Sequence, residues 1–358
     1  MDIARSLGQI ERCRYPSGLY SAVPADSPVK IDLYRSVWIR DSIYTLLAFE
    51  ALGDLDTLRA GVHALLDRIL LRWAPRVDWR IVHGPPEKDI DYLHPRFTAD
   101  GSEIRTEIWG LRQDDAVGLT VWALSRWHER YEVLRNDYED FHLVQKLIWY
   151  LDRIDVPHRP DNGIWEEEEP TRAVHLSSLA AVAAGLAQAA RIGIADIPPR
   201  LKDETLLAIE RMNGRESSHH DTDLALLTLV WPLGEDVSIP LRVQRDVVER
   251  VERELLGARG VVRYLGDGYN NCHDGPPEWT MGLGFLALAW NQLGVPQRAI
   301  AYLEWLEAVA TSEAELPEAW CRDPSHDHYF NSPLCWSHAL HIVARAELAG
   351  IARHDRAA

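Results

Sequence analysis

The stretch IRDSIYTLLAFEALG (39–53) is followed at once by DLDTLRAGVHALLDRILLRW (54–73), and the contrast between the two decides the fold. The first is almost free of charge beyond its opening turn, so it predicts a helix that is buried on every side. The second sets apolar residues at helical spacing against a charged face, which is typical of a helix that can face water. The sequence therefore predicts an inner helix followed by an outer one.

The same pairing recurs along the chain. Nearly every charge-poor helix is followed by an amphipathic one, so the pair repeats about six times, with the last partner missing or supplied by the N-terminus. This alternation predicts an all-α fold, an (α/α)6 barrel with an inner ring of helices inside an outer ring. An open solenoid is the structural alternative, but its repeats would be more regular. The other expected inner helices are 114–127, 175–190, 221–231, 278–294 and 333–350, and the other outer ones are 138–154, 201–212, 243–257 and 295–312.

Length and composition allow one large domain or two ordinary ones. The 358 residues are 46% hydrophobic, which is enough for a substantial core. We expect a single domain over 1–358, with 1–30 as an N-terminal lead-in segment.

The charge balance excludes several classes of partner. Lys and Arg number 38 against 55 Asp and Glu, and the resulting net charge of −17 repels nucleic acid and anionic membranes. The charged N-terminus does not resemble a signal peptide, and the uncharged run 173–190 is interpreted as a buried helix. The four cysteines are widely spaced, so we predict neither a disulfide scaffold nor a metal site, and we expect a cytoplasmic protein. They are Cys13, Cys272, Cys321 and Cys335.

Polar and aromatic residues concentrate in the loops that precede the inner helices. In a ring of helices those loops converge on one end, where a pocket would draw on distant segments. Flat apolar faces beside fixed hydrogen-bonding groups suit a sugar ring, whereas no Gly-rich nucleotide-binding motif is present. The tryptophans in or beside these loops are Trp38, Trp109, Trp165, Trp279, Trp320 and Trp336.

Each of these residues also has a purely structural interpretation. Asp41 and Asp115 stand at helix starts, where an acid caps the first amide groups. A single tryptophan packs in a core more often than it binds a ligand. His219 and His220 are readily explained as an ordinary loop feature.

Two glutamates are candidates for glycosidic bond hydrolysis, which needs one protonated and one ionised carboxyl group. Glu166 follows Trp165 in GIWEEEE (163–169), where an aromatic neighbour and adjacent negative charge would raise its pKa. Glu318 lies in LPEAW (316–320), before the last inner helix. In the predicted ring the two loops lie across the mouth, which favours the inverting arrangement with carboxyls roughly 6.5–9.5 Å apart. Glu167 helps to bind substrate or raises the pKa of its neighbour, and the rest of the run is solvated.

The motifs VWIRD, QDD, GIWEE, RYLGDGY followed by a Trp, LPE and PLxWSHA, in this order, resemble glycoside hydrolase family 15, the glucoamylase family. The likeness spans roughly residues 15–350 and implies the (α/α)6 barrel predicted above. It also implies inverting cleavage of α-glucosidic bonds from the nonreducing end, with no cofactor and no metal. Since the barrel fills the chain, we expect short α-glucosides such as isomaltose or isomalto-oligosaccharides.

The resemblance also implies roles for single residues. Glu166 matches the general acid and Glu318 the general base. Arg40 and Asp41 match the pair that holds the nonreducing-end glucose. The other residues expected to bind substrate are Trp38, Trp109, Asp115, Trp165, Glu167, Arg263, Trp279 and Trp336.

Two other functions stay open. The stretches 15–22, 37–53, 218–232 and 263–269 are also similar to the glucoamylase-like domain of the phosphorylase kinase α and β subunits, which are regulatory. That likeness implies a glucoside-sensing module without catalysis. An α,α-trehalase would use the same machinery with different subsites.

Overall fold

Helices make up most of the computed structural model, which describes residues 1–28, 32–104, 110–135, 138–167, 172–269, 272–325 and 327–350. The chain divides into two units, described here one at a time. The first unit comprises Met1–Leu58, Thr222–Trp231 and Pro240–Ala358, and the second comprises Arg59–Asp221 and Pro232–Ile239. Within the described residues, no helix combines the length and the apolarity that crossing a bilayer requires.

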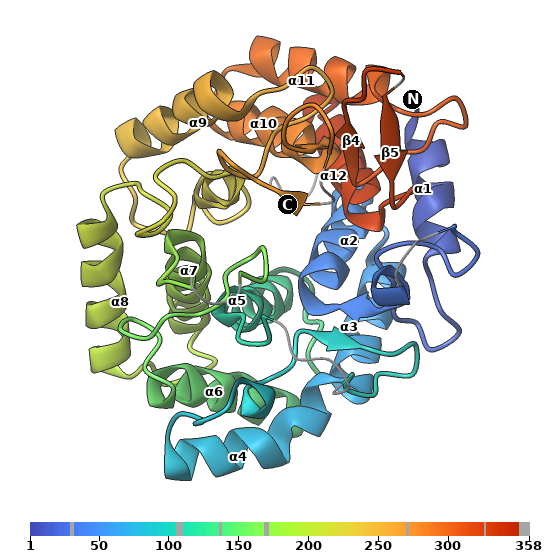
Figure 1. The fold of residues 1–358 in the computed structure, drawn as a ribbon. Coiled ribbons are helices and arrows are strands. Elements are labelled where there is room, and N and C mark those ends of the chain that lie inside the picture. Colours follow the sequence, from blue (N-terminus) through green and yellow to red (C-terminus); the bar gives the residue numbers. More distant parts are fainter. Residues whose placement is uncertain are drawn as a thin grey trace. The chain divides into compact units, whose positions relative to one another are not determined.

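The first unit is built around three largely buried helices, α2, α10 and α12. In Figure 1, α12 lies beside both α2 and α10, and α11 lies against α10. Its elements are α1 (Ile3–Arg12), η1 (Asp32–Arg35), β1 (Val37–Trp38), α2 (Ile39–Leu52), η4 (Leu224–Leu229), α9 (Leu241–Leu255), β3 (Glu278–Trp279), α10 (Thr280–Gln292), α11 (Pro296–Ala308), β4 (Ala319–Cys321), β5 (His328–Phe330) and α12 (Cys335–Leu348).

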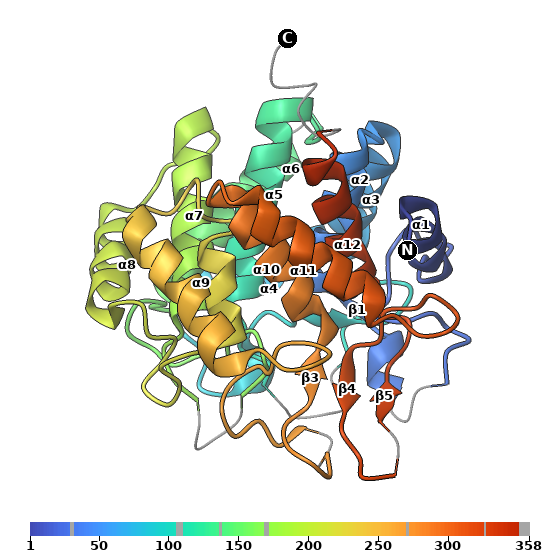
Figure 2. The same ribbon diagram turned by 90° about the horizontal axis from the view of Figure 1, so that it is seen from above.

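In the second unit, α5 and α7 form the buried pair. α8 packs against α7, as Figure 2 shows, and α6 packs against α5 and α4. Its elements are η2 (Leu70–Trp73), α4 (Ala74–His83), η3 (Asp89–Asp91), β2 (Arg96–Phe97), α5 (Asp114–Tyr131), α6 (Tyr138–Arg153), α7 (Leu176–Ile192) and α8 (Pro199–Met212), while α3 (Leu55–Arg68) spans the boundary with the first unit.

The buried contact between α5 and α7 depends on two glycines. A Cβ atom on Gly118 would lie 2.5 Å from the backbone nitrogen of Val182, and one on Gly185 would lie 2.7 Å from the carbonyl oxygen of Gly118. Real side chains do not tolerate such distances, so the two backbones approach closely only because both positions lack a side chain.

The predicted helices are confirmed with few exceptions. Residues 39–53, 114–127, 175–190, 278–294 and 333–350 contain the buried helices α2, α5, α7, α10 and α12. The run 173–190 is confirmed as a buried helix. The N-terminal helix α1 packs on α12, so the chain start does supply a helix to the last inner one.

The stretch 221–231 forms a shorter element than expected. Only the 3-10 helix η4 is present, because Asp223 caps its start by accepting from Ala225 N and Pro232 follows closely. Short helical segments wind more tightly, as 3-10 turns. Helix α4 has no counterpart among the predicted helices.

A small antiparallel sheet in the first unit carries several residues of interest. β3 pairs with β4 and β4 with β5, with Trp279 opposite Ala319 and Trp320 opposite Tyr329. Cys272 and Cys321 form a disulfide with a Cα–Cα distance of 5.3 Å, which fastens the 272–278 loop to β4. The prediction from the wide spacing of the cysteines missed this bond, because its two cysteines lie 49 residues apart and meet only in the folded chain.

Candidate functional site

Glu318, the predicted general base, lies directly before β4 in the first unit and is 5% exposed. Tyr34 donates its hydroxyl proton to Glu318 Oε1 at 2.9 Å, and Asn331 Nδ2 donates to Oε2 at 2.7 Å. The backbone N–H of Glu318 also donates to the carbonyl of Asn331 at 3.1 Å. Both carboxylate oxygens are therefore held in fixed directions by neutral donors.

Arg40 and Asp41 lie buried in the first turn of α2, directly after Trp38 at the end of β1. The Arg40 guanidinium lies 5.9 Å from the ring centre of Trp336, a residue of α12. The Trp336 ring stacks on the ring of Tyr44 in α2, with 4.8 Å between the ring centres. Burial raises the pKa of Asp41 to about 6, against the opposing effect of Arg40. The two helices thus bring together an arginine, a carboxyl group and a flat aromatic face.

Arg263 and Trp279, expected to line neighbouring subsites, are in contact. The guanidinium lies 4.5 Å from the centre of the Trp279 ring, and both side chains donate to the carboxylate of Asp267. Tyr269 lies 5.3 Å from the Trp279 ring and hydrogen-bonds to Tyr34. This places the Arg263 cluster next to the groups that hold Glu318.

Glu166, the predicted general acid, lies in the second unit in a loop before α7. Its backbone is left-handed, with φ +57°, and its side chain is half-exposed. A Cβ atom on Gly110 would lie 2.6 Å from the Glu166 carbonyl oxygen, so only glycine lets the 110–113 segment pack here.

Glu167, the next residue, is buried. Its Oε1 lies 3.0 Å from His220 Nε2, and its Oε2 lies 3.6 Å from His175 Nε2. Burial alone would raise the pKa of Glu167, but the interactions with His175 and His220 lower it to about 2. Asp161 Oδ1 lies 2.8 Å from His175 Nδ1, and the two carboxylates raise the pKa of His175 well above its usual range despite burial.

The start of α5 adds further buried charge. Arg112 pairs with Asp114 at 2.8 Å, and burial raises the pKa of Asp114 to about 6 in spite of that pair. Asp115 is 5% exposed in the same helical turn, and Trp165 is half-exposed. Trp109 lies outside the described residues.

The structure thus groups the predicted residues by unit. Several residues that contact these predicted residues were not predicted themselves, because the contacts form only through the strand register of the hairpin or the conformation of the loops. Asp267 and Tyr269 belong to the RYLGDGY motif, so the motif did signal that pair. The first unit contains Trp38, Arg40, Asp41, Arg263, Trp279, Glu318 and Trp336. The second unit contains Asp115, Trp165, Glu166 and Glu167. The residues that hold them and were not predicted are Tyr34, Asp161, His175, His220, Asp267, Tyr269 and Asn331.

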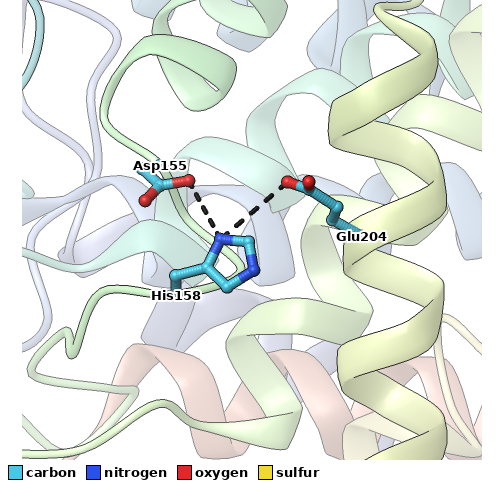
Figure 3. Close-up of side chains that lie close together, drawn as sticks. All are labelled: Asp155, His158 and Glu204. Atoms are coloured by element: carbon cyan, nitrogen blue, oxygen red, sulfur yellow. Dashed lines mark hydrogen bonds and ion pairs between the residues drawn. The ribbon is translucent and has the colours of Figure 1, made fainter.

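One group of possible metal ligands occurs among the described residues, formed by Asp155, His158 and Glu204. Figure 3 shows His158 directed at both carboxylates. Arg200 shares the same oxygens, at 3.2 Å from Asp155 and 3.0 Å from Glu204. A guanidinium already balances the two acids, so this group is an ion-pair cluster and does not argue for a bound cation.

Comparison with solved structures identifies the fold. A glycosidase variant in complex with glucose superposes with a TM-score of 0.77, covering 98% of this chain and 99% of that one at 22% identity. The glucoamylase from Saccharomycopsis fibuligera gives a TM-score of 0.65, covering 98% and 94% at 16% identity. The predicted all-α, (α/α)6 barrel fold class is confirmed.

Sequence comparison gives a relative of another kind. The chain is 25% identical to the regulatory α subunit of phosphorylase b kinase from rabbit (Oryctolagus cuniculus), skeletal muscle isoform, over 84% of its own length. It spans only 28% of that subunit. Residues 3–202, more than half of the chain, match the glycosyl hydrolases family 15. The chain therefore belongs to glycosyl hydrolases family 15, as its motifs predicted.

Proposed function

We propose that the protein is an exo-acting, inverting α-glucoside hydrolase that releases glucose from the nonreducing end of short α-glucosides. Isomaltose and isomalto-oligosaccharides are the substrates we favour. The observation that carries this proposal is the buried carboxylate of Glu318, aligned by Tyr34 and Asn331 in a chain of this family. A carboxylate held in this way suits a general base.

In the proposed mechanism Glu166 acts as the general acid and Glu318 as the general base. Glu166 gives its proton to the glycosidic oxygen, and the bond from that oxygen to the anomeric carbon breaks. Glu318 takes a proton from a water molecule, whose oxygen attacks the anomeric carbon from the opposite face. Glucose leaves as the β-anomer, and Arg40, Asp41 and Trp336 recognise its ring.

The first experiment is a panel of α-1,4-, α-1,6- and α,α-1,1-linked glucosides followed by NMR. We expect hydrolysis of the α-1,6 linkage with the β-anomer appearing first. Release of the α-anomer would refute inversion, and preference for the α,α-1,1 linkage would identify a trehalase.

The second experiment replaces each glutamate separately. Glu166→Gln and Glu318→Gln should each lower kcat by at least about two orders of magnitude, because each removes one proton-transfer group. Unchanged kcat in either variant would refute that assignment.

A non-catalytic role is the alternative, favoured by the similarity to a regulatory kinase subunit over most of the chain. Such a module would bind glucosides saturably in calorimetry without turning them over. The sequence retains both glutamates, the Arg40–Asp41 pair and the tryptophans of the family motifs, and this retention favours the enzyme.

The expected cytoplasmic location remains a proposal, and the Cys272–Cys321 pair offers its test. Disulfides are rare in a reducing cytoplasm. Rapid thiol trapping in whole cells, followed by mass spectrometry, should find these cysteines reduced if the location is correct.

A further inference from the structure

The loop that carries Glu166 is closed by the residue that follows it. Glu167 donates its backbone N–H to the carbonyl of Asn162 at 2.7 Å, and its own carbonyl accepts from Asn162 Nδ2. Asn162 is in turn tied to Arg112, since Asn162 Oδ1 accepts from Arg112 N at 2.9 Å. The backbone of Glu167 is therefore fixed on both sides of its peptide unit.

The side chain of Glu167 is fixed as well, by His175 and His220. His175 is itself held from behind, because its Nδ1 lies 2.8 Å from Asp161, whose other oxygen accepts from Ser178. The remaining partner of the Glu167 carboxylate is His220, whose side chain is 14% exposed.

A tight turn decides which of two adjacent histidines reaches Glu167. Ser217 Oγ accepts the backbone N–H groups of His219 and His220, both at 3.1 Å, and Ser217 N donates to the His220 carbonyl. The preceding Glu216 holds Ser177 at the start of α7. The turn is thereby anchored beside His175, with His220 directed inward and His219 exposed.

We propose that His220 is a positioning residue that acts through Glu167 to hold the loop on which Glu166 is presented. This inference rests on the proposed function of Glu166. Glu166 directly precedes Glu167, and its left-handed backbone belongs to the loop that the Glu167 hydrogen bonds close. Because His220 contacts Glu167, its loss would loosen the residue next to the acid without removing a group that contacts substrate.

Titratable and charged groups surround the Glu167 carboxylate. His175 and His220 face the carboxylate, Asp161 and Glu216 act on His175 from the far side, and the Arg112–Asp114 pair acts on Asp161. The lowered pKa of Glu167 keeps it ionised at any pH at which the protein would be assayed.

The test compares His220→Leu with His220→Gln, and uses His219→Leu as the matched control. Leucine removes the N–H donor, whereas the glutamine amide can replace Nε2. We expect His220→Leu to lower kcat on isomaltose about 10- to 100-fold with KM changed less than about threefold, because small displacements of a reacting group are that costly. His220→Gln should recover most of the rate, and His219→Leu should match the unmodified enzyme.

A second readout does not depend on turnover. The Glu167 amide, bonded to Asn162, should exchange its hydrogen faster in His220→Leu than in His219→Leu. If His220→Leu does not fold, His220→Asn, whose amide is too short to reach, takes its place in both measurements.

Equal kcat and equal exchange in the two leucine variants would overturn the inference, as would a rise in KM alone, which would make His220 a substrate contact. If the protein hydrolyses no glucoside, the proposed function is refuted. The hydrogen-exchange measurement then still decides whether His220 holds the loop.

Discussion

Asn331 holds Glu318 from a left-handed backbone position with φ +51°. Asn331→Gly keeps that backbone conformation favourable and removes only the amide that donates to Glu318. A hydrogen bond to a charged group contributes about 1.5–3 kcal/mol, so we expect kcat to fall roughly 10- to 100-fold. Steady-state kinetics on isomaltose test this, with thermal unfolding as the control for folding. An unchanged kcat would show that Tyr34 alone aligns the base.

The lowered pKa of Glu167 predicts how the free energy of unfolding changes at acid pH. Its folded pKa of about 2 lies below its ordinary value of 4.5, so the unfolded chain takes up the proton first as pH falls. The stabilisation is therefore complete above about pH 4.5 and is lost as pH falls towards 2. The difference in unfolding free energy between the unmodified protein and Glu167→Gln should shrink over that interval in urea titrations. A difference that stays constant with pH would contradict the assignment.

At the residue scale, the sequence predicted groups that sit within a motif and missed groups that meet only through folding. Arg263 and Trp279 were both expected to bind substrate, and they are in contact. Asn331 reaches Glu318 through the β4–β5 hairpin, whose three-residue strands carry no readable alternation of polar and apolar residues. His220 was interpreted as an ordinary loop feature, because nothing in the sequence indicates which loop it faces.

At the scale of elements, the contact between α5 and α7 sets a limit on side-chain size. Gly118→Ala should lower the free energy of unfolding by about 1–3 kcal/mol, because the new methyl group would meet the rigid backbone of Val182. Gly8→Ala in α1 is the matched control, since nothing lies within 4 Å of its added Cβ atom. That change should stabilise by about 0.5–1 kcal/mol through helix propensity. Urea denaturation measures both, and equal effects would show that the helices can move apart.

Helices were predictable from the sequence because burial on all sides leaves a run without charges, as in α10 and α12. Short elements were not. The 3-10 helix η4 and the strands β3 to β5 are set by caps and by pairing with distant residues, so local periodicity carries little information about them.

At the scale of the whole molecule, the Cys272–Cys321 disulfide closes a loop with a sequence separation of 49 residues. Replacing both cysteines by serine should cost about 2–4 kcal/mol, because the unfolded chain gains the freedom that the bond removes. Thermal unfolding of the oxidised protein and of the double variant measures the difference. An identical midpoint would indicate that the bond does not form in solution.

The overall fold was predictable because the same pair of helices repeats along the chain. In each pair a charge-free helix is buried behind a helix with a charged face. The family followed from motifs at the starts of those helices. The network behind Glu167 did not follow from either signal, since it joins Asp161 and His175 of the loop before α7 to His220 of the loop after α8.

The left-handed backbone of Glu166 implies a trade between activity and stability. An L-residue in this conformation costs roughly 1–2 kcal/mol that glycine does not incur. Glu166→Gly should therefore unfold at a higher temperature than the unmodified protein while losing the hydrolysis proposed above. Selection for stability alone would discard this glutamate, so a lineage that gave up hydrolysis would be free to replace it with glycine.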